Sequence, residues 1–285
     1  MLVANCSALR RLVSLGQQLH GGGSTCSTST GCARPAPAAA ASRGTRLAGK
    51  TAVVTGGGTG IGEAIVRSLY AEGCTVWAVG RRLEPLQGLV AECPGVHTRS
   101  VDVADEAAVA ALFAEVGRCD ILINNAGINI VDRAFKVLDP ADFRKVLEIN
   151  TVGAFNCIHH CVEGAGGMAA AQDGGLIVNV SSIAGMRTYE LSGTAYTTSK
   201  FAMNALGSAV AAEYRESGIR VTNLCPGEVL TPIMKLRPVQ PSAEHLATIC
   251  QPEDVAECVM LVACLNKRAN IPELVIKPTK QLYPA

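Results

Sequence analysis

The sequence lacks the features of several other protein classes. No apolar run reaches the ~20 residues that a membrane-spanning helix needs. None of the twelve cysteines forms a C-x-x-C pair or a zinc-type spacing, so we expect buried free thiols, a reducing compartment and no metal site. The net charge is only +1, which gives no reason to expect a nucleic-acid surface. A globular chain of 285 residues remains, with 48% hydrophobic residues.

Acidic residues are missing from the beginning of the chain. Residues 1–49 hold five arginines and no acid, and the first acidic residue is Glu63. Residues 8–20 have the pattern of a basic amphipathic helix, and residues 21–41 are rich in Gly, Ser, Thr, Pro and Ala. This composition is typical of an organelle transit peptide. We expect residues 1–45 to be a disordered leader that directs the protein to an organellar matrix, the mitochondrion before the plastid. The alternative is a cytoplasmic protein with a disordered tail.

Strand-type and helix-type segments alternate from residue 51 onward. The patterns predict strands at 51–55, 74–79, 96–103, 120–124, 176–180, 219–224 and 274–276. They predict helices at 61–71, 83–90, 107–116, 140–161, 195–216 and 252–265. Strands separated by helices imply a parallel sheet that is covered on both faces. We therefore expect one doubly wound, Rossmann-type α/β domain over residues 46–285, with about seven strands and a ligand site at their carboxyl ends.

A glycine-rich turn joins the first predicted strand to the first helix. Its candidate phosphate-binding residues are Gly56, Gly58, Thr59, Gly60, Ile61 and Gly62. Glycines allow a tight turn and a close approach of pyrophosphate, and the helix start offers free N–H groups and a positive dipole end. The turn could be purely structural, but its place directly after the first strand favours a dinucleotide.

The end of the second strand favours NADP(H) over NAD(H). An acidic residue at this place commonly binds the ribose 2′-hydroxyl, and none is present after Gly80. Arg81 and Arg82 stand there instead and suit a 2′-phosphate. The alternative is that both arginines only solubilise the start of a helix.

Tyr196 and Lys200 are four residues apart and should share one helix face. An ammonium group beside a phenol lowers the pKa of the phenol, which suits proton exchange with a substrate oxygen. Tyr196 is the only one of the five tyrosines with a lysine at this spacing. Alone, the pair also fits an ordinary helix with an exposed lysine.

Five motifs in this order resemble the short-chain dehydrogenase/reductase family over about residues 50–279. They are TGGGTGIG at 55–62, NNAG at 124–127, the helix asparagine Asn150, VNVSS at 178–182, and the Pro-Gly segment at 226–231. The resemblance implies a catalytic set of Asn150, Ser182, Tyr196 and Lys200. It implies further cofactor contacts at Asp102, Val103, Asn124, Ala126, Gly127, Tyr196, Lys200, Pro226, Gly227, Val229 and Thr231.

The resemblance also implies a reaction, namely hydride transfer between a nicotinamide and a carbonyl or alcohol. Ser182 would orient the carbonyl and Tyr196 would act as acid or base. Lys200 would lower the pKa of Tyr196 and hold the ribose, and Asn150 would position a relay water. The C-terminal segment resembles the NADP-dependent branch that acts on 3-hydroxy acids and small alcohols.

Other functions remain open from the sequence. One is a catalytically silent NADP(H) sensor or scaffold on the same fold, and another is a reductase of β-ketoacyl groups on an acyl carrier. Arg187 or Arg237 could bind a substrate carboxylate, although both also fit solvated surface charges. The family resemblance and the long predicted helices, which are rich in small residues, lead us to expect a homodimer or homotetramer.

Overall fold

A parallel sheet of seven strands forms the centre of the domain. The computed structural model describes residues 45–171 and 174–282, so the predicted leader lies almost wholly outside the described part. The strands are β1 (Thr51–Thr55), β2 (Thr75–Gly80), β3 (His97–Ser100), β4 (Ile121–Asn124), β5 (Gly175–Val180), β6 (Ile219–Pro226) and β7 (Glu273–Ile276). Their order is β3-β2-β1-β4-β5-β6-β7, with every pair parallel. The doubly wound α/β fold expected from the sequence is confirmed.

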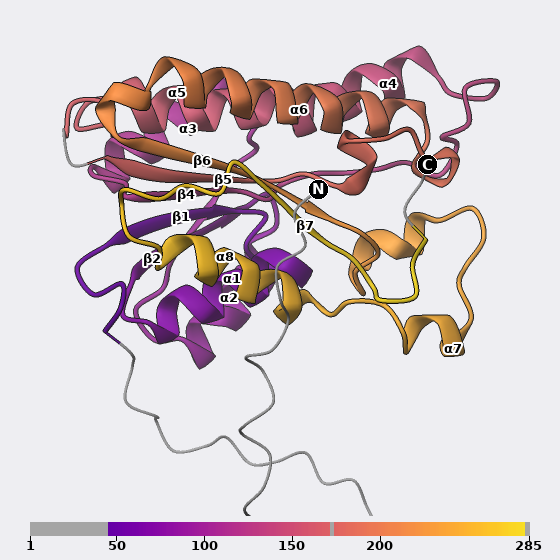
Figure 1. Ribbon diagram of the computed structural model, residues 1–285, viewed down its shortest axis with the longest axis horizontal. Helices are drawn as coiled ribbons and strands as arrows, with labels where there is room; N and C mark the ends of the chain where they lie inside the picture. The colour runs from indigo at the N-terminus through magenta and orange to yellow at the C-terminus, as the bar shows by residue number, and fades with distance from the viewer. Residues whose placement is uncertain (1–44, 172–173, 283–285) are drawn as a thin grey trace, which may run out of the picture. The chain divides into compact units, whose positions relative to one another are not determined.

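Helices cover both faces of the sheet (Figure 1). On one face lie α3 (Glu106–Val116), α4 (Pro140–Leu147), α5 (Gly153–Glu163) and α6 (Thr194–Glu213). On the other lie α1 (Gly60–Ala71), α2 (Leu83–Glu92) and α8 (Pro252–Ala263). Within the described residues, none of these helices is both long enough and apolar enough to cross a bilayer.

A hydrophobic core lies on each face of the sheet, because side chains alternate between the two faces along each buried strand. In β1, Val53 points into the core beneath α3 and α5, while Val54 points into the core shared with α1 and α8. In β4, Leu122 points into the same core as Val53, and Ile123 points into the same core as Val54. All four side chains are fully buried, which explains why these strands read as continuous apolar runs.

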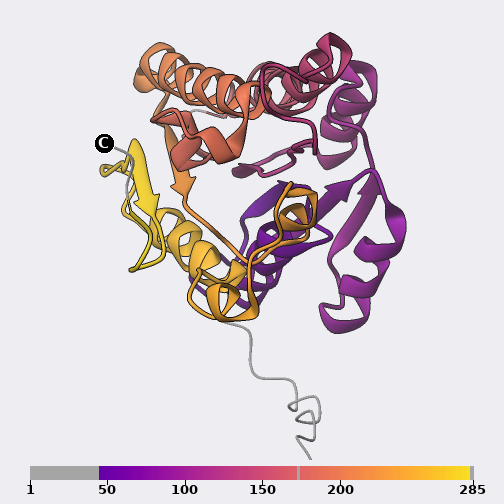
Figure 2. The same ribbon diagram turned by 90° about the vertical axis from the view of Figure 1, so that its right-hand side faces the viewer.

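The site position follows from the strand order. β1 lies between β2 and β4, so the chain winds outward in opposite directions from this point. A crevice opens at such a switch point, outside the carboxyl ends of the strands. Two short elements after β6, η5 (Pro232–Leu236) and α7 (Ala243–Leu246), lie at this end of the domain (Figures 1 and 2).

Two elements differ from the sequence expectation. The predicted helix over 140–161 is interrupted by a π-helical turn, Glu148–Val152, which separates α4 from α5. The predicted strand over 96–103 ends earlier, at Ser100, because its only partner β2 ends at Gly80 opposite that residue. Beyond this point an edge strand has no neighbour to pair with.

Candidate active site

The glycine turn packs so tightly that side chains are excluded from it. Gly56 and Gly60 have φ of +64° and +56°, in the left-handed region that favours glycine. A Cβ atom at Gly62 would lie 2.1 Å from the carbonyl oxygen of Gly56. α1 begins at Gly60, so its first N–H groups face the turn and form a site for an anion.

Two residues from neighbouring strands hold this turn in place. The Asn125 side chain donates hydrogen bonds to the carbonyl oxygens of Thr55 and Gly56, at 3.0 and 3.1 Å. In return, the Thr55 hydroxyl accepts from the backbone N–H groups of Asn125 and Ala126. The NNAG segment therefore acts on the glycine turn through Asn125, which the sequence analysis did not include among the site residues.

Two cavities lie along the carboxyl edge of the sheet. One is lined by turn and strand-end residues that the sequence pointed to, namely Gly56, Gly58, Thr59, Arg81 and Arg82. The other contains predicted residues from both halves of the sheet, namely Ile61, Ser182, Tyr196, Pro226, Gly227, Val229 and Thr231. Thr59 and Ile61 line different cavities, and Gly60 between them faces Thr231. An extended ligand could therefore occupy both.

Tyr196 and Ser182 meet inside the second cavity. Tyr196 belongs to the first turn of α6, and Ser182 follows β5 and caps the short helix η2 (Ile183–Gly185). The Ser182 hydroxyl hydrogen-bonds to the Tyr196 hydroxyl. Burial raises the pKa of Tyr196 to about 12, while the Ser182 hydrogen bond and the charge of Arg133 oppose that rise.

Lys200 lies one helical turn further along, as its spacing predicts. Its Nζ atom is 5.6 Å from the centre of the Tyr196 ring and donates to the Val180 carbonyl oxygen at 2.8 Å. Burial lowers the pKa of Lys200 to about 8. The net shift of the Tyr196 pKa is upward, not downward as the pairing with Lys200 predicted, because burial of the phenol outweighs the Ser182 hydrogen bond and the Arg133 charge.

Asn150 lies in the π-helical turn and is fully buried. Its amide makes two hydrogen bonds with the backbone of Ile128 and a third with the Ser199 hydroxyl. A Cβ atom at Gly127 would lie 3.3 Å from the Asn150 side chain and 3.6 Å from Lys200 Nζ, so these three residues meet. The structure thus brings Asn150 and Lys200 to the same place behind the cavity.

Further predicted cofactor-contact residues lie at or just beyond the ends of the neighbouring strands β2 and β3. Arg81 and Arg82 follow β2, are exposed, and form no ion pair with any described carboxylate. Asp102 lies just beyond β3 and accepts a hydrogen bond from the backbone of Ala104. Val103 is buried, and its carbonyl oxygen accepts from Asn156.

The side chain of Asn124, a predicted cofactor contact, points away from both cavities. It donates to Asn179 on β5, which donates to Asn223 on β6, which donates to the Asn204 carbonyl oxygen on α6. All three of the donating asparagines are buried. Asn124 therefore belongs to a ladder of amides inside the domain and does not line either cavity.

Comparison with known proteins agrees with this geometry. The family model described as short chain dehydrogenase matches residues 50–240. The chain belongs to the short-chain dehydrogenase family. A 3beta-hydroxysteroid dehydrogenase of Mediterraneibacter gnavus is 38% identical over 192 residues, which are 65% of this chain and 67% of the relative. A farnesol dehydrogenase of Aedes aegypti is 31% identical over 250 residues, covering 84% and 99% of the two chains. The closed form of serine dehydrogenase with NADP+ superimposes with a TM-score of 0.76 at 29% identity, covering 82% and 97%.

The lining of the second cavity in this short-chain dehydrogenase includes residues that the sequence analysis did not single out. Arg133 and Gln281 are two of them. Gln281 comes from the C-terminal segment, and its amide oxygen accepts the Glu228 N–H at 3.0 Å. Neither residue belongs to one of the five motifs, which explains why sequence patterns did not identify them. Within residues 45–171 and 174–282, no cluster of His, Cys, Asp and Glu could hold a metal ion.

Proposed function

We propose that this short-chain dehydrogenase transfers a hydride between NADP(H) and a small carbonyl or alcohol substrate. One observation carries the proposal. One cavity brings Tyr196 and Ser182 together with Pro226 and Gly227, which lie at the end of the neighbouring strand β6, and with Ile61, which comes from the opposite half of the sheet. A substrate oxygen in this cavity would be within reach of both hydroxyl groups.

The residues present fit a phosphorylated dinucleotide. The glycine turn leaves backbone N–H groups open at the start of α1, which favours pyrophosphate. Arg81 and Arg82 border the first cavity, no described carboxylate pairs with their guanidinium groups, and a 2′-phosphate would supply their counter-charge. The similar structure of serine dehydrogenase in complex with NADP+ also supports NADP(H) as the cofactor.

In carbonyl reduction, the side chains of the protein would orient the substrate and donate a proton to it. The bound nicotinamide would supply the hydride. Ser182 would donate a hydrogen bond to the carbonyl oxygen and hold it beside Tyr196. Since the pKa of Tyr196 is about 12, its hydroxyl is protonated at neutral pH and can donate to an oxygen that gains negative charge.

Lys200 and Asn150, which lie behind the cavity, would assist proton transfer by Tyr196. With a pKa of about 8, Lys200 is mostly cationic at neutral pH and would stabilise the phenolate left after proton transfer. Asn150 would position a water that returns a proton to Lys200. In the direction of alcohol oxidation the phenolate would act as the base.

The test is the oxidation of NADPH by the full chain with aldehydes, diketones and oxo acids. Tyr196→Phe should lower kcat by about 10²–10⁴-fold while NADPH affinity stays within about twofold. Ser208→Ala, an exposed change on the outer side of α6, is the matched control and should keep full activity. NADPH binding without turnover by the wild type would favour a sensor or scaffold, and turnover only of carrier-bound β-ketoacyl groups would favour the carrier reductase.

A further inference from the structure

Arg133 is a buried charge without a counter-charge. It follows β4 in the loop before α4 and is only 7% exposed. Among the described residues, no carboxylate pairs with its guanidinium group. Removing a charge from water without a counter-ion is costly, so a position of this kind calls for an explanation.

The guanidinium group also has unused hydrogen-bonding capacity. Its Nη1 atom donates to the Leu191 carbonyl oxygen at 3.2 Å, and its Nη2 atom donates to the Leu236 carbonyl oxygen. Its Nε atom is buried and has no hydrogen-bond partner in the described part of the chain. Two carbonyl dipoles therefore hold the group in place, and they leave its positive charge and several N–H donors unsatisfied.

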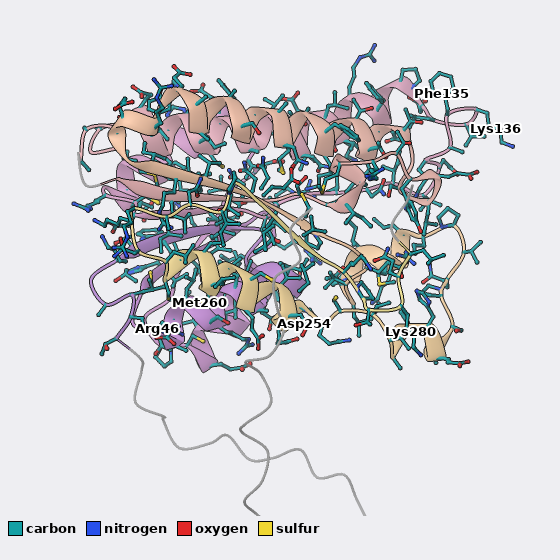
Figure 3. The ribbon with its side chains drawn as sticks, in the orientation of Figure 1. Arg46, Phe135, Lys136, Asp254, Met260 and Lys280 are labelled. Carbon is teal, nitrogen blue, oxygen red and sulfur yellow. The ribbon has the colours of Figure 1, made fainter. Side chains whose placement is uncertain are left out.

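The group lies in the wall of the cavity that contains Tyr196 and Ser182. Its charge acts on the Tyr196 phenol, so the two side chains are electrostatic neighbours. Figure 3 shows Phe135 and Lys136, which follow Arg133 closely in the chain, at the same end of the domain as Lys280 and opposite to Arg46. The cavity lining itself places Arg133 beside the predicted catalytic residues Ser182 and Tyr196.

The other charges around the cavity do not neutralise Arg133. The lining holds one further arginine, Arg237, and one acid, Glu228. These two form an ion pair at 2.8 Å, and His245 also contacts Glu228, at 2.7 Å. Since Glu228 is engaged by Arg237, the cavity keeps one unbalanced positive charge, which is that of Arg133.

We infer that Arg133 binds a carboxylate on the substrate and selects small oxo acids or hydroxy acids over neutral carbonyl compounds. A planar guanidinium group matches the two oxygens of a carboxylate and is always charged. The position beside Tyr196 would place the carboxylate a short distance from the reacting carbonyl. The inference rests on the proposed function for the reaction itself and adds the chemical class of the substrate.

The two arginines that the sequence left open as carboxylate-binding residues are less suitable than Arg133. Arg187 is exposed and does not line the cavity. Arg237 lines it, but Glu228 already neutralises its charge. Arg133, which no motif marked, is the arginine that remains available.

The experiment compares 3-oxobutanoate with its neutral amide, 3-oxobutanamide, as substrates of the full chain with NADPH. The wild type should prefer the carboxylate by about tenfold or more in kcat/KM, as expected for a hydrogen bond to a charged group. Arg133→Gln should lower kcat/KM for the carboxylate about 10–100-fold and leave the value for the amide within about threefold. Arg133→Lys should restore part of the preference, because it keeps the charge. Arg187→Gln removes the same charge from the surface and should leave both substrates unchanged.

A binding measurement separates this inference from the proposed function. Calorimetry of the NADP+-loaded protein with 3-hydroxybutyrate should show binding by the wild type and its loss in Arg133→Gln, whether or not turnover occurs. Carboxylate binding that depends on Arg133, without turnover of any substrate, would reject the oxidoreductase and keep the site. Turnover with equal losses for both substrates in Arg133→Gln would reject the site and keep the oxidoreductase. If that variant does not fold, a wild-type preference for the amide would by itself overturn the inference.

Discussion

Asn150 and Ile128 are joined by two hydrogen bonds between the asparagine amide and the isoleucine backbone. The side-chain oxygen accepts the Ile128 N–H at 2.8 Å, and the side-chain nitrogen donates to the Ile128 carbonyl oxygen at 2.9 Å. An amide that pairs in this way fixes both the position and the direction of the loop after β4. The π-helical turn that carries Asn150 therefore shapes the back of the active site.

Replacing Asn150 with leucine should affect both stability and rate. Asn150→Leu removes three buried hydrogen bonds and leaves the Ile128 backbone unpaired, so the free energy of unfolding should fall by about 3 kcal/mol. The loop shift should lower kcat more than it raises the KM for NADPH. Urea titration and steady-state kinetics measure the two effects, and an unchanged kcat would contradict the role of this pair.

Lys200 combines a functional position with a cost in stability. Burial lowers its pKa to about 8, so at neutral pH the folded protein carries a cation that it disfavours. Lys200→Met should abolish activity but raise the free energy of unfolding at about pH 7 by about 2 kcal/mol, after the loss of the hydrogen bond to Val180 is subtracted.

The gain in the free energy of unfolding from Lys200→Met should depend on pH, and the sign of this dependence follows from the Lys200 pKa. Because the pKa of Lys200 is lower in the folded state, the unfolded state binds more protons above about pH 8, and wild-type stability from this group rises with pH. The advantage of Lys200→Met should therefore shrink between about pH 8 and about pH 10. Urea titrations of both proteins across this range check the sign, and a gain that grows with pH would refute the argument.

The same residue shows how far the sequence could predict the site. The spacing of Tyr196 and Lys200 placed both on one face of one helix, as the structure confirms. The predicted direction of the Tyr196 pKa shift was wrong, because the spacing of two residues does not reveal how deeply a phenol is buried. Arg133 could not be found at all, since a loop arginine reads as a solvated charge until the fold shows what surrounds it.

The arginines after β2 should determine cofactor preference. Arg81→Ala is expected to weaken NADPH binding about 10–100-fold, because a charge-assisted hydrogen bond to a 2′-phosphate is lost. NADH has no such phosphate, so its affinity should change less than about twofold. Fluorescence titration with both dinucleotides gives the comparison. Equal losses for NADPH and NADH would mean that Arg81 contacts another part of the cofactor.

The outer faces of α5 and α6 carry apolar side chains that suit a contact between subunits. Phe155 is 51% exposed and Phe201 is 41% exposed. If these faces pair in a homodimer or homotetramer, the double variant Phe155→Glu and Phe201→Glu should lower the mass in solution to that of one chain. Analytical ultracentrifugation makes the measurement, and Phe135→Glu, on a loop residue that is 82% exposed, serves as a control. A wild-type chain that sediments as a monomer would remove the expectation of an oligomer.

The fold itself was largely predictable, and its departures have local causes. The alternation of apolar strands and helices predicted all seven strands and the doubly wound arrangement. The role of Asn124 was not predictable, because its partner Asn179 lies 55 residues further along the chain, and Asn223, the next member of the ladder, lies 99 residues further. A sequence motif indicates that an asparagine is needed, but the register of β4, β5 and β6 decides what it contacts.

The last prediction concerns Gly207 of α6, which packs closely against the asparagine ladder. A Cβ atom there would lie 2.2 Å from Asn223 Oδ1 and 2.6 Å from Asn179 Nδ2. Alanine is the better helix former by about 1 kcal/mol, but the overlap with buried amides should outweigh this, so Gly207→Ala should lower the free energy of unfolding by about 2 kcal/mol. Gly88→Ala in α2 is the matched control, because nothing lies within 4 Å of its added methyl group. That variant should gain about 0.5–1 kcal/mol. Urea titration of both variants decides the matter, and a gain in both would show that the ladder yields to the methyl group.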